Sequence, residues 1–486
     1  MGLLAIGLLL RIVAFQGYSD SDPREYTILA DDLARGVFHL GSYDGPAVFS
    51  LRTGVYGPTA LLIRIFGLSE LTIVAYPLLV SIAGCLLAYA VARGFWGPLA
   101  GLLGLAVWVV VPLDIRLSSL LYPDAIAAFW GNLAVACLLL ALGRTGPRQL
   151  AYAFAGGLFL GVSWLCKETV VYLAPFLLFL AWTQQRERPL KARATTVLMV
   201  AAGGAAVVAI EMALFHFASG DALLRLHGTE KNYDQAAIWF FDPSSPYFGW
   251  QSGGYGKAMI KRLFIEGPKQ LLTTDTLGSL PAFAVLGLAW AALFSRERRF
   301  LVLGAWTVSL LLMFNFMTIS FRAYRPLPLF DRYLHPLLLP AAVCVAGFLR
   351  GLLSPSSTEA ERPLGRERSF WAVVTLLLFA LLCLLQVPKI VAGRADRLER
   401  TVARSLGASD LIFSDFRTAR SLVFFRTRSL APSTATTVPF EKKEAAQLPR
   451  GAYVLIDKEM IEFMMKIDHS WETSAQQYIS LYQSLK

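Results

Sequence analysis

Charged side chains gather directly after the first apolar run of the sequence. Asp20 and Asp22 are followed closely by Arg24, Glu25 and Tyr26. A carboxylate of this kind can take the proton of an incoming hydroxyl group as a general base. One serine separates the two aspartates, so the residues alone leave both as candidates for that role. The next segment, 30–36, predicts a short amphipathic helix that ends at a glycine.

Further charges mark the ends of later apolar runs. Asp124 opens one run directly after Tyr122-Pro123, Lys167-Glu168 separates two runs, and Arg332 precedes another. Lys and Arg side chains can bind a phosphate and neutralise the charge that develops on a phosphate leaving group. Together with the carboxylates, these residues favour the transfer of a group from a lipid-linked phosphate donor.

The composition shows what kind of protein must position these residues. The chain has 486 residues, of which 56% are hydrophobic and only 16% are charged. A soluble globular protein carries about 25% charged residues, so we interpret the chain as an integral membrane protein. Its net charge of +11 is concentrated in short loops between apolar runs, as orientation signals are. We therefore expect a membrane as partner and no nucleic acid.

The apolar runs predict about eleven membrane spans. A span needs about 20 residues, and shorter runs fit where the bilayer thins or neighbouring helices help. The first run lacks the basic start and the cleavage site of a signal peptide, so we expect a retained span, although the true start could lie upstream. The predicted spans are 1–15, 71–91, 98–112, 125–142, 150–166, 169–183, 195–217, 277–294, 300–319, 333–353 and 370–387.

Lys and Arg occur mainly in alternate, short loops between these spans. By the positive-inside rule these loops face the cytoplasm, so the long loops 16–70 and 218–276 face outward. The tail after 387 lies on the same side. We therefore expect a multi-pass protein of the cytoplasmic (inner) membrane, with the acidic loops and the C-terminal domain extracytoplasmic.

The tail has a different character from the rest of the chain. Segments 411–413 and 452–457 are typical of short buried strands, and helical and turn segments separate them. We predict two domains, a transmembrane module at 1–387 and a small α/β domain at 388–486. The tail carries no glycine-rich phosphate loop and no nucleophile motif, which favours contact with an acceptor over catalysis.

Several motifs resemble the membrane-embedded glycosyltransferases of the C-type fold, in the group that includes protein O-mannosyltransferases and lipid A aminoarabinose transferases. The resemblance covers roughly residues 1–350. The order of the motifs, their spacing and their common side of the membrane carry more weight than any single motif. The motifs are the acidic loop 20–26 with its trailing Gly36, the turn Val55-Tyr56-Gly57-Pro58, Tyr122-Pro123-Asp124, the run 157–168 that ends in Lys167-Glu168, and Arg332-Tyr333-Leu334.

The resemblance implies a polytopic α-helical membrane protein with roles for particular residues. Its proposed catalytic base maps to Asp22, with Asp20 as the second candidate because the Asp-Ser-Asp doublet leaves the register open. It implies that Asp124 is a further acidic site residue, that Lys167 binds the donor phosphate, and that Arg332 contacts it too. We expect these neighbouring residues to bind substrate as well: Glu168, Arg24 and Tyr26.

The function that this resemblance implies is the transfer of a sugar from a polyprenyl-phosphate carrier to a hydroxyl group of a lipid, glycan or protein. The alternative is a transporter or flippase of a lipid-linked or anionic solute. It would need a charged path through the spans, which are nearly free of charge after Arg11. A ligase acting on pyrophosphate-linked glycans should carry an arginine-rich loop, yet 218–276 holds only Arg225 and Arg262. The sugar, the acceptor, the oligomeric state and the role of a divalent cation are left open.

The remaining reactive side chains fit ordinary structural roles. The five cysteines match no metal or disulfide pattern and suit packing between helices. The histidines show no metal-ligand spacing, and we interpret His216 and His335 as interface anchors. The aromatic loop 233–257 is typical of an interfacial belt, with sugar stacking as the alternative.

Overall fold

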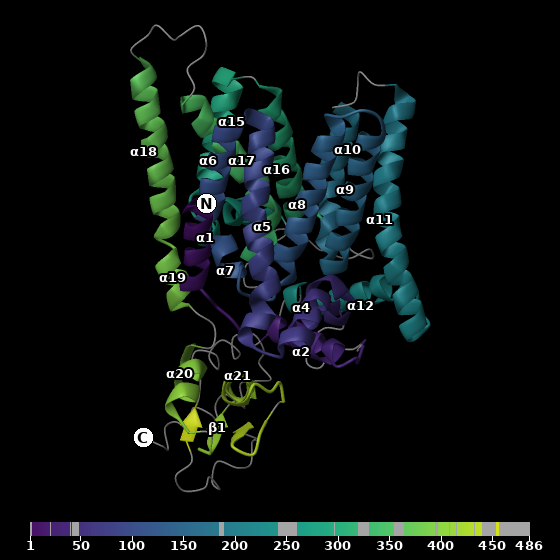
Figure 1. The fold of residues 1–486 in the computed structure, drawn as a ribbon, viewed down its shortest axis with the longest axis vertical. Coiled ribbons are helices and arrows are strands. Elements are labelled where there is room, and N and C mark those ends of the chain that lie inside the picture. Colours follow the sequence, from purple (N-terminus) through teal and green to yellow (C-terminus); the bar gives the residue numbers. More distant parts are fainter. Residues whose placement is uncertain are drawn as a thin grey trace.

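The protein forms a bundle of long helices with a smaller lobe at one end (Figure 1). The lobe belongs to the tail, and it lies at the same end of the bundle as α2 (Asp22–Ala34) and α4 (Thr53–Phe66). The computed structural model describes residues 2–19, 21–38, 40, 48–183, 189–241, 260–295, 297–318, 330–353, 364–393, 397–407, 409–414, 416–431, 433–439 and 453–455.

Proline and glycine mark many of the helix boundaries. Pro98, Pro112 and Pro123 each lie in the first turn of a helix, where the missing N–H removes no helical hydrogen bond. The other helices up to residue 392 are α1 (Gly2–Val13), α3 (Val48–Leu51), α5 (Glu70–Trp96), α6 (Pro98–Val109), α7 (Pro112–Leu117), α8 (Pro123–Leu142), α9 (Gly146–Cys166), η1 (Glu168–Leu173), α10 (Ala174–Thr183), α11 (Leu190–Ser219), α12 (Leu224–Phe241), η3 (Arg262–Glu266), α14 (Gly267–Thr273), η4 (Asp275–Leu277), α15 (Leu280–Trp290), η5 (Ala291–Ser295), α16 (Arg298–Phe316), η6 (Asp331–Leu337), α17 (Leu338–Leu353), α18 (Leu364–Leu384) and α19 (Val387–Ala392).

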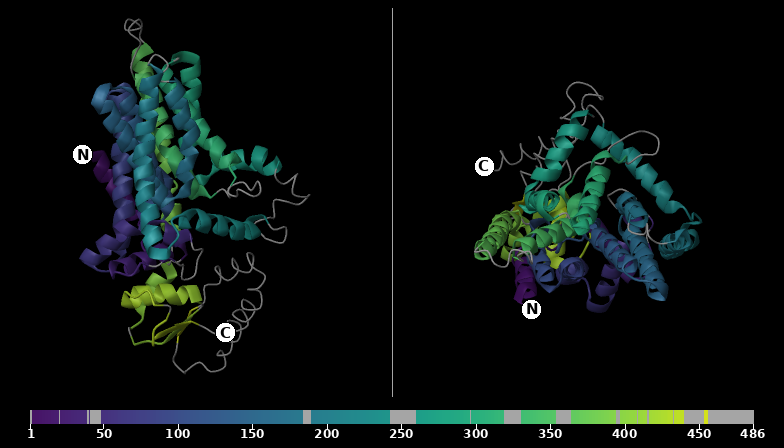
Figure 2. Two further views of the ribbon diagram at one scale, coloured as in Figure 1. Left: turned by 90° about the vertical axis from the view of Figure 1, so that its right-hand side faces the viewer. Right: turned by 90° about the horizontal axis from the view of Figure 1, so that it is seen from above.

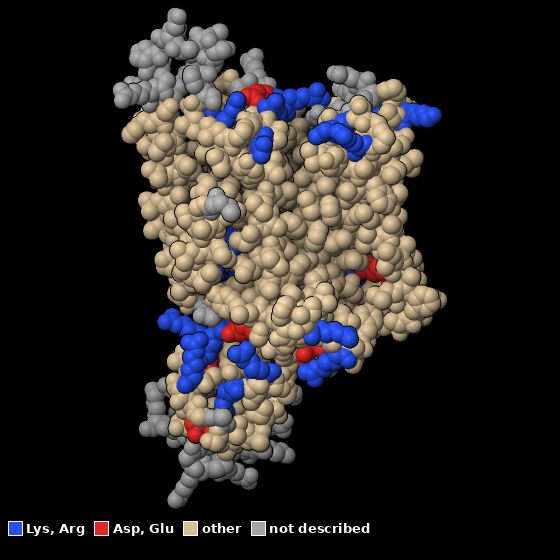
Figure 3. All heavy atoms as spheres, viewed as in Figure 1, with Lys and Arg blue, Asp and Glu red and all other residues tan. Residues whose placement is uncertain are grey.

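Seven helices in the described part of the chain are long and apolar enough to cross a membrane. A bent helix pair, Leu263–Leu277 with Leu280–Phe294, would add an eighth span. The remaining predicted spans coincide with three shorter apolar helices, Gly2–Val13, Pro98–Val109 and Glu168–Leu180, whose crossing of the bilayer stays a prediction. Lys and Arg lie in a band at the end of the bundle opposite the lobe, and they also lie, mixed with Asp and Glu, on and beside the lobe (Figure 3). Helix α12 lies across the end of the bundle nearest the lobe and projects to one side (Figure 2).

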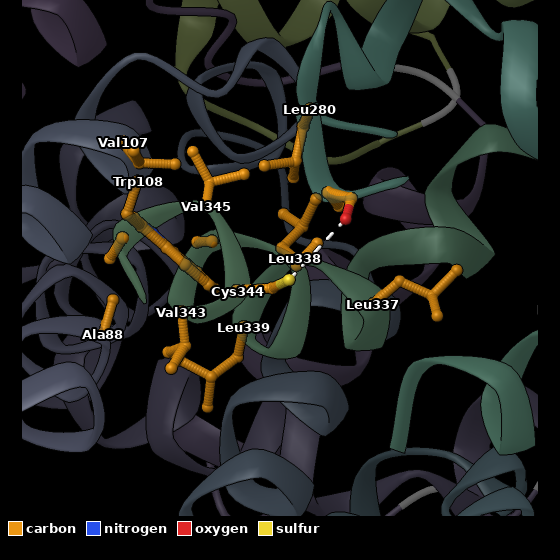
Figure 4. Close-up of a cluster of buried hydrophobic side chains, with 14 of the residues drawn as sticks. Ala88, Val107, Trp108, Leu280, Leu337, Leu338, Leu339, Val343, Cys344 and Val345 are labelled. Carbon is orange, nitrogen blue, oxygen red and sulfur yellow. Dashed lines mark hydrogen bonds between the residues drawn. The ribbon is translucent and has the colours of Figure 1, made fainter. Parts of the chain in front are cut away.

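The largest apolar core joins α5, α6, α15 and α17. Trp108 of α6 and Leu338 of α17 are buried there, with Ala88 of α5 and Leu280 of α15 beside them (Figure 4). The thiol of Cys344 donates to the Ala284 carbonyl, at 3.6 Å from Sγ to oxygen. All five cysteines are buried and free, as expected for residues that pack between helices.

Helices α9 and α11 pack closely through small residues. A Cβ atom on Gly203 would lie 2.2 Å from the Phe154 carbonyl oxygen, and one on Gly157 would lie 2.1 Å from that of Val200. Membrane helices use small residues in this way because lipid supplies no hydrophobic force that drives them together. The contact fixes α9, the helix that ends directly before Lys167.

The described part of the tail contains two helices and a small parallel sheet. The helices are α20 (Arg397–Ser405) and α21 (Phe416–Thr427), and the strands are β1 (Ile412–Ser414), β2 (Thr437–Pro439) and β3 (Tyr453–Leu455). The strand order is β2-β1-β3. The two predicted strand segments correspond to β1 and β3, whereas β2 was not predicted from the sequence.

The tail is held against the segment that links α1 to α2. Arg400 of α20 donates to the carbonyls of Gln16 and Tyr18, both at 2.9 Å, and pairs with Glu70 at 2.5 Å. Tyr18 stacks on Phe424 of α21, with ring centroids 3.9 Å apart. Gly17, between the two carbonyls, has φ +78°, and a Cβ atom there would lie 2.2 Å from Glu70 Oε1.

Two local predictions about the first loop need correction. The predicted helix at 30–36 is present up to Ala34, and Gly36 follows its end with φ +86°, but it is the end of a longer helix, α2, which already begins at Asp22 because Pro23 starts it. The predicted turn at 55–58 lies inside α4. Proline within a helix costs about 3 kcal/mol. In α4 this cost is offset by a buried face that includes Val55, Tyr56 and Ile63.

Candidate functional site

Helix α2 presents Asp22 at its first position. The preceding residue, Ser21, has φ +75°, a backbone conformation that is strained for a residue with a side chain. Asp22 Oδ2 lies 3.0 Å from Arg332 Nη2, and 24% of the Asp22 side chain remains exposed. The carboxylate is therefore held in place and still accessible from outside.

Helix α8 presents Asp124 in its first turn, directly after Pro123. The side chain is only 2% exposed. Oδ1 pairs with the Lys167 ammonium group, and Oδ2 lies 3.6 Å from Arg332 Nε. That separation is too long for a hydrogen bond, and neither atom has a hydrogen-bond partner among the residues that the structure describes.

Lys167 is placed by the end of α9. Its backbone is extended, with φ −163° and ψ 141°, so the chain leaves the helix there and turns into η1. The ammonium nitrogen lies 3.6 Å from the centre of the Tyr333 ring. Burial lowers the pKa of this amine to about 8, although the Asp124 carboxylate acts in the opposite direction.

Arg332 joins the two aspartates. It lies in η6, and its guanidinium carbon is 4.6 Å from the centre of the Tyr122 ring and 5.3 Å from that of Phe330. Burial raises the pKa of the Tyr122 hydroxyl to about 12, so this ring stays neutral. We call Asp22, Asp124, Lys167 and Arg332 the charge cluster. Its members come from four elements that are distant in sequence.

Two further arginines, which were not predicted as site residues, extend the charge cluster. Arg52 donates to the Tyr26 hydroxyl at 2.9 Å and pairs with Glu168 at 3.0 Å. Arg225 pairs with Glu168 at 2.9 Å and with Glu211 at 2.7 Å. The sequence held one signal for Arg225. Glu211 lies inside the predicted span 195–217, and a carboxylate at that depth needs a buried cationic partner.

The structure thus brings some of the predicted site residues together and leaves others apart. Tyr26 and Glu168 join through Arg52, and burial raises the pKa of the Tyr26 hydroxyl above its ordinary value. Arg24 is buried, and its ion pair is with the adjacent Glu25, at 3.2 Å. Asp20 lies outside the described residues, as do residues 242–259 of the aromatic loop.

The interpretation of His335 as an interface anchor is wrong. The side chain is buried, and its Nε2 lies 3.0 Å from Asp114 Oδ1. Asp114 also pairs with Arg11 and accepts a hydrogen bond from Ser81 at 2.6 Å. This buried network ties η6, which also carries Arg332, to α1, α5 and α7.

Metal-ligating side chains are not clustered in the part of the chain that the structure describes. No group of three or more His, Cys, Asp and Glu side chains there could hold a metal ion. A role for a divalent cation therefore stays an open prediction.

Three comparisons bear on what kind of protein carries this site. A family model described as dolichyl-phosphate-mannose-protein mannosyltransferase matches residues 58–212, a range that includes Asp124 and Lys167. No curated protein matches the chain. Among solved structures, ArnT from Cupriavidus metallidurans in the apo state has a TM-score of 0.52 at 14% identity, over 95% of this chain and 93% of that one.

Other solved structures agree. ArnT bound to undecaprenyl phosphate matches with a TM-score of 0.54 at 14% identity, over 95% of this chain and 90% of that one. The oligosaccharyltransferase from Archaeoglobus fulgidus in the apo form matches with a TM-score of 0.53 at 15% identity, over 91% of this chain and 61% of that one. The chain has the C-type glycosyltransferase fold. The resemblance inferred from the motifs is confirmed.

Proposed function

We propose that this protein transfers a sugar from a polyprenyl-phosphate carrier to an acceptor hydroxyl group at the outer face of the cytoplasmic membrane. The observation that carries the proposal is the charge cluster, in which Arg332 joins Asp22 and Asp124 while Lys167 pairs with Asp124. The C-type glycosyltransferase fold supports it, as does the likeness to ArnT, which was solved with undecaprenyl phosphate bound.

The solvent exposure of the two aspartates indicates their different roles. Asp22 is the general base, because it is the more accessible of the two aspartates. The acceptor oxygen attacks the anomeric carbon of the sugar, and Asp22 takes the hydroxyl proton. The bond from that carbon to the phosphate oxygen breaks, and its electrons leave with the polyprenyl phosphate. Lys167 and Arg332 neutralise the charge on this leaving group.

Donor binding frees the base. In the structure Asp22 is paired with Arg332, so the guanidinium group occupies the carboxylate oxygen that an acceptor hydroxyl would contact. A donor phosphate that takes over Arg332 releases Asp22 for the acceptor. The buried atoms Asp124 Oδ2 and Arg332 Nε have no hydrogen bond within the described ranges, and they suit a sugar hydroxyl and a phosphate oxygen respectively.

The proposed function also assigns a role to each of the two domains. We propose that residues 1–387 form the transmembrane transfer module and that 388–486 form a small extracytoplasmic α/β domain beside the acceptor. The Lys and Arg of the short loops between the spans, which lie in the band at the opposite end of the bundle (Figure 3), support this orientation. The transporter alternative is less favoured, because the charge cluster sits at one end of the bundle.

The direct test is Asp22→Asn. This change keeps the size of the side chain but removes the base. We expect normal expression and folding together with a fall in transfer of roughly 100-fold or more. Transfer is followed by mass spectrometry of glycolipids and glycoproteins from cells with and without the protein.

The matched control is Asp32→Asn, on the same helix but outside the charge cluster, which should leave transfer unchanged. Asp20→Asn is assayed in parallel, because Asp20 is the second candidate for the base. Full activity of both the Asp22→Asn and Asp20→Asn variants would overturn the assignment. Each assay is run with and without a chelator, which tests the open role of a divalent cation.

A further inference from the structure

An apolar cavity lies far from the charge cluster. Its volume is about 620 Å³, and it is lined by parts of α5, α8 and α16. This volume falls within the range of small-molecule binding sites, which is about 300–1,000 Å³. We call it the α5–α8–α16 groove. Its lining includes Leu87 and Val91 of α5 and Leu133 and Leu140 of α8.

The groove has an apolar length and a charged end. Along α8 it runs from Leu133 to Gly143, which corresponds to about 15 Å of helix. Half of a bilayer's hydrocarbon core is also about 15 Å thick. Arg298 and Arg299 line the groove at the start of α16, so both guanidinium groups lie at one end.

In the part of the chain that the structure describes, neither of these two arginines forms an ion pair. Both side chains are exposed, and Arg298 donates only to the Thr183 carbonyl, at 2.9 Å, among the described contacts. The nearest acid along the chain, Glu297, accepts a hydrogen bond from Trp96 Nε1 at 2.8 Å. An anionic group beside the two arginines would complete the charge balance.

We propose that the α5–α8–α16 groove binds an anionic phospholipid. One acyl chain lies along the apolar wall, and the phosphate lies between Arg298 and Arg299. Basic pockets between membrane helices bind anionic headgroups in this way. The proposal stands apart from the proposed transfer reaction, because the groove lies towards the end of α8 opposite to Asp124.

The test measures lipid binding to the purified full-length protein by native mass spectrometry. Phosphatidylglycerol and phosphatidylcholine with identical acyl chains are offered in turn. We expect the unchanged protein to retain phosphatidylglycerol preferentially. The variant with Arg298→Gln and Arg299→Gln should bind it roughly 30-fold more weakly, the factor expected for two arginines beside an anionic headgroup.

Two further variants separate charge from shape. Arg93→Gln removes one positive charge at the same end of the bundle, from a side chain that interacts with Tyr89 and is not among the residues that line the groove, so binding should not change. Ala90→Trp fills the apolar part from an exposed position and should weaken the binding of both lipids.

Four results would overturn the proposal. One is equal retention of phosphatidylglycerol by the double variant and the unchanged protein, and another is an equal loss in Arg93→Gln. The third is displacement of the lipid by inorganic phosphate alone, which would indicate a simple anion site. The last is stronger binding of polyprenyl phosphate than of phosphatidylglycerol, which would assign the groove to a different lipid.

Discussion

Asp22 and Asp124 both contact Arg332, yet solvent reaches only one of them to any extent. Asp124 is enclosed by Lys167 and Arg332 and is 2% exposed, whereas Asp22 is 24% exposed at the start of a helix. A proton acceptor must be reached by its substrate, and a buried carboxylate with two cationic neighbours instead fixes those neighbours. The two aspartates therefore suit different roles in spite of their shared partner.

The pH dependence of transfer should report on Lys167. Burial lowers the pKa of its amine to about 8, so the ammonium charge is present below that pH and is lost above it. We expect transfer to decline as the pH rises through about 8, because the donor phosphate then loses a cationic partner. Lys167→Arg keeps its charge over this range and should move the decline to higher pH. An unchanged pH profile in that variant would contradict the role of Lys167.

Some site residues could be predicted from the sequence because they stand where charge is costly. Asp124, Lys167 and Arg332 each lie at the edge of an apolar run, and such positions are rare and usually functional. Arg52 and Arg225 lie in segments of ordinary composition. Their role depends on the way α3, α4 and α12 fold back towards Glu168, which no local pattern encodes.

The buried network around Asp114 should hold several helices together. Arg11→Leu would leave the Asp114 carboxylate buried without its main counter-charge, and we expect a loss of about 3–5 kcal/mol in the free energy of unfolding in detergent. The double variant Arg11→Leu with Asp114→Leu should recover part of that stability. A double variant less stable than Arg11→Leu alone would contradict this explanation.

The contact between α9 and α11 should tolerate no side chain at Gly203. Gly203→Leu forces atoms into the backbone of α9, so we expect a loss of at least about 1–3 kcal/mol of stability and reduced transfer, since α9 positions Lys167. The control is Gly204→Ala, whose Cβ atom would lie at 3.5 Å from its nearest neighbour and should be tolerated. Thermal unfolding and transfer measured on both variants test this, and equal behaviour of the two would contradict it.

The sequence predicted helices and strands unequally well. Long apolar runs locate the spans because burial in lipid demands them. The helical state of Pro58 could not be predicted, because the packing of α4 overrides the local preference of proline. Strand β2 has three residues, one of which is proline, so it carries no alternating pattern that could reveal it.

Arg400 should keep the tail docked against the segment that links α1 to α2. Arg400→Ala removes the donor to two backbone carbonyls and the counter-charge of Glu70. We expect faster cleavage of the tail by protease, because its docking weakens while its own fold persists. Arg404→Ala changes an exposed arginine on the same helix. The protease should cleave the tail of this variant at the rate of the unchanged protein. Equal rates in both variants would contradict docking through Arg400.

The attachment of α20 also sets an order of assembly. Arg400 is separated from its partners Gln16 and Tyr18 by 384 and 382 residues of chain. At a synthesis rate of about 5–20 residues per second, roughly 20–80 seconds pass between the making of the two sides of this contact. During that interval the segment before Asp22 lacks its hydrogen bonds from Arg400. A segment made long after the first loop therefore completes that loop, and a ribosome that stops before α20 leaves the start of α2 without this contact.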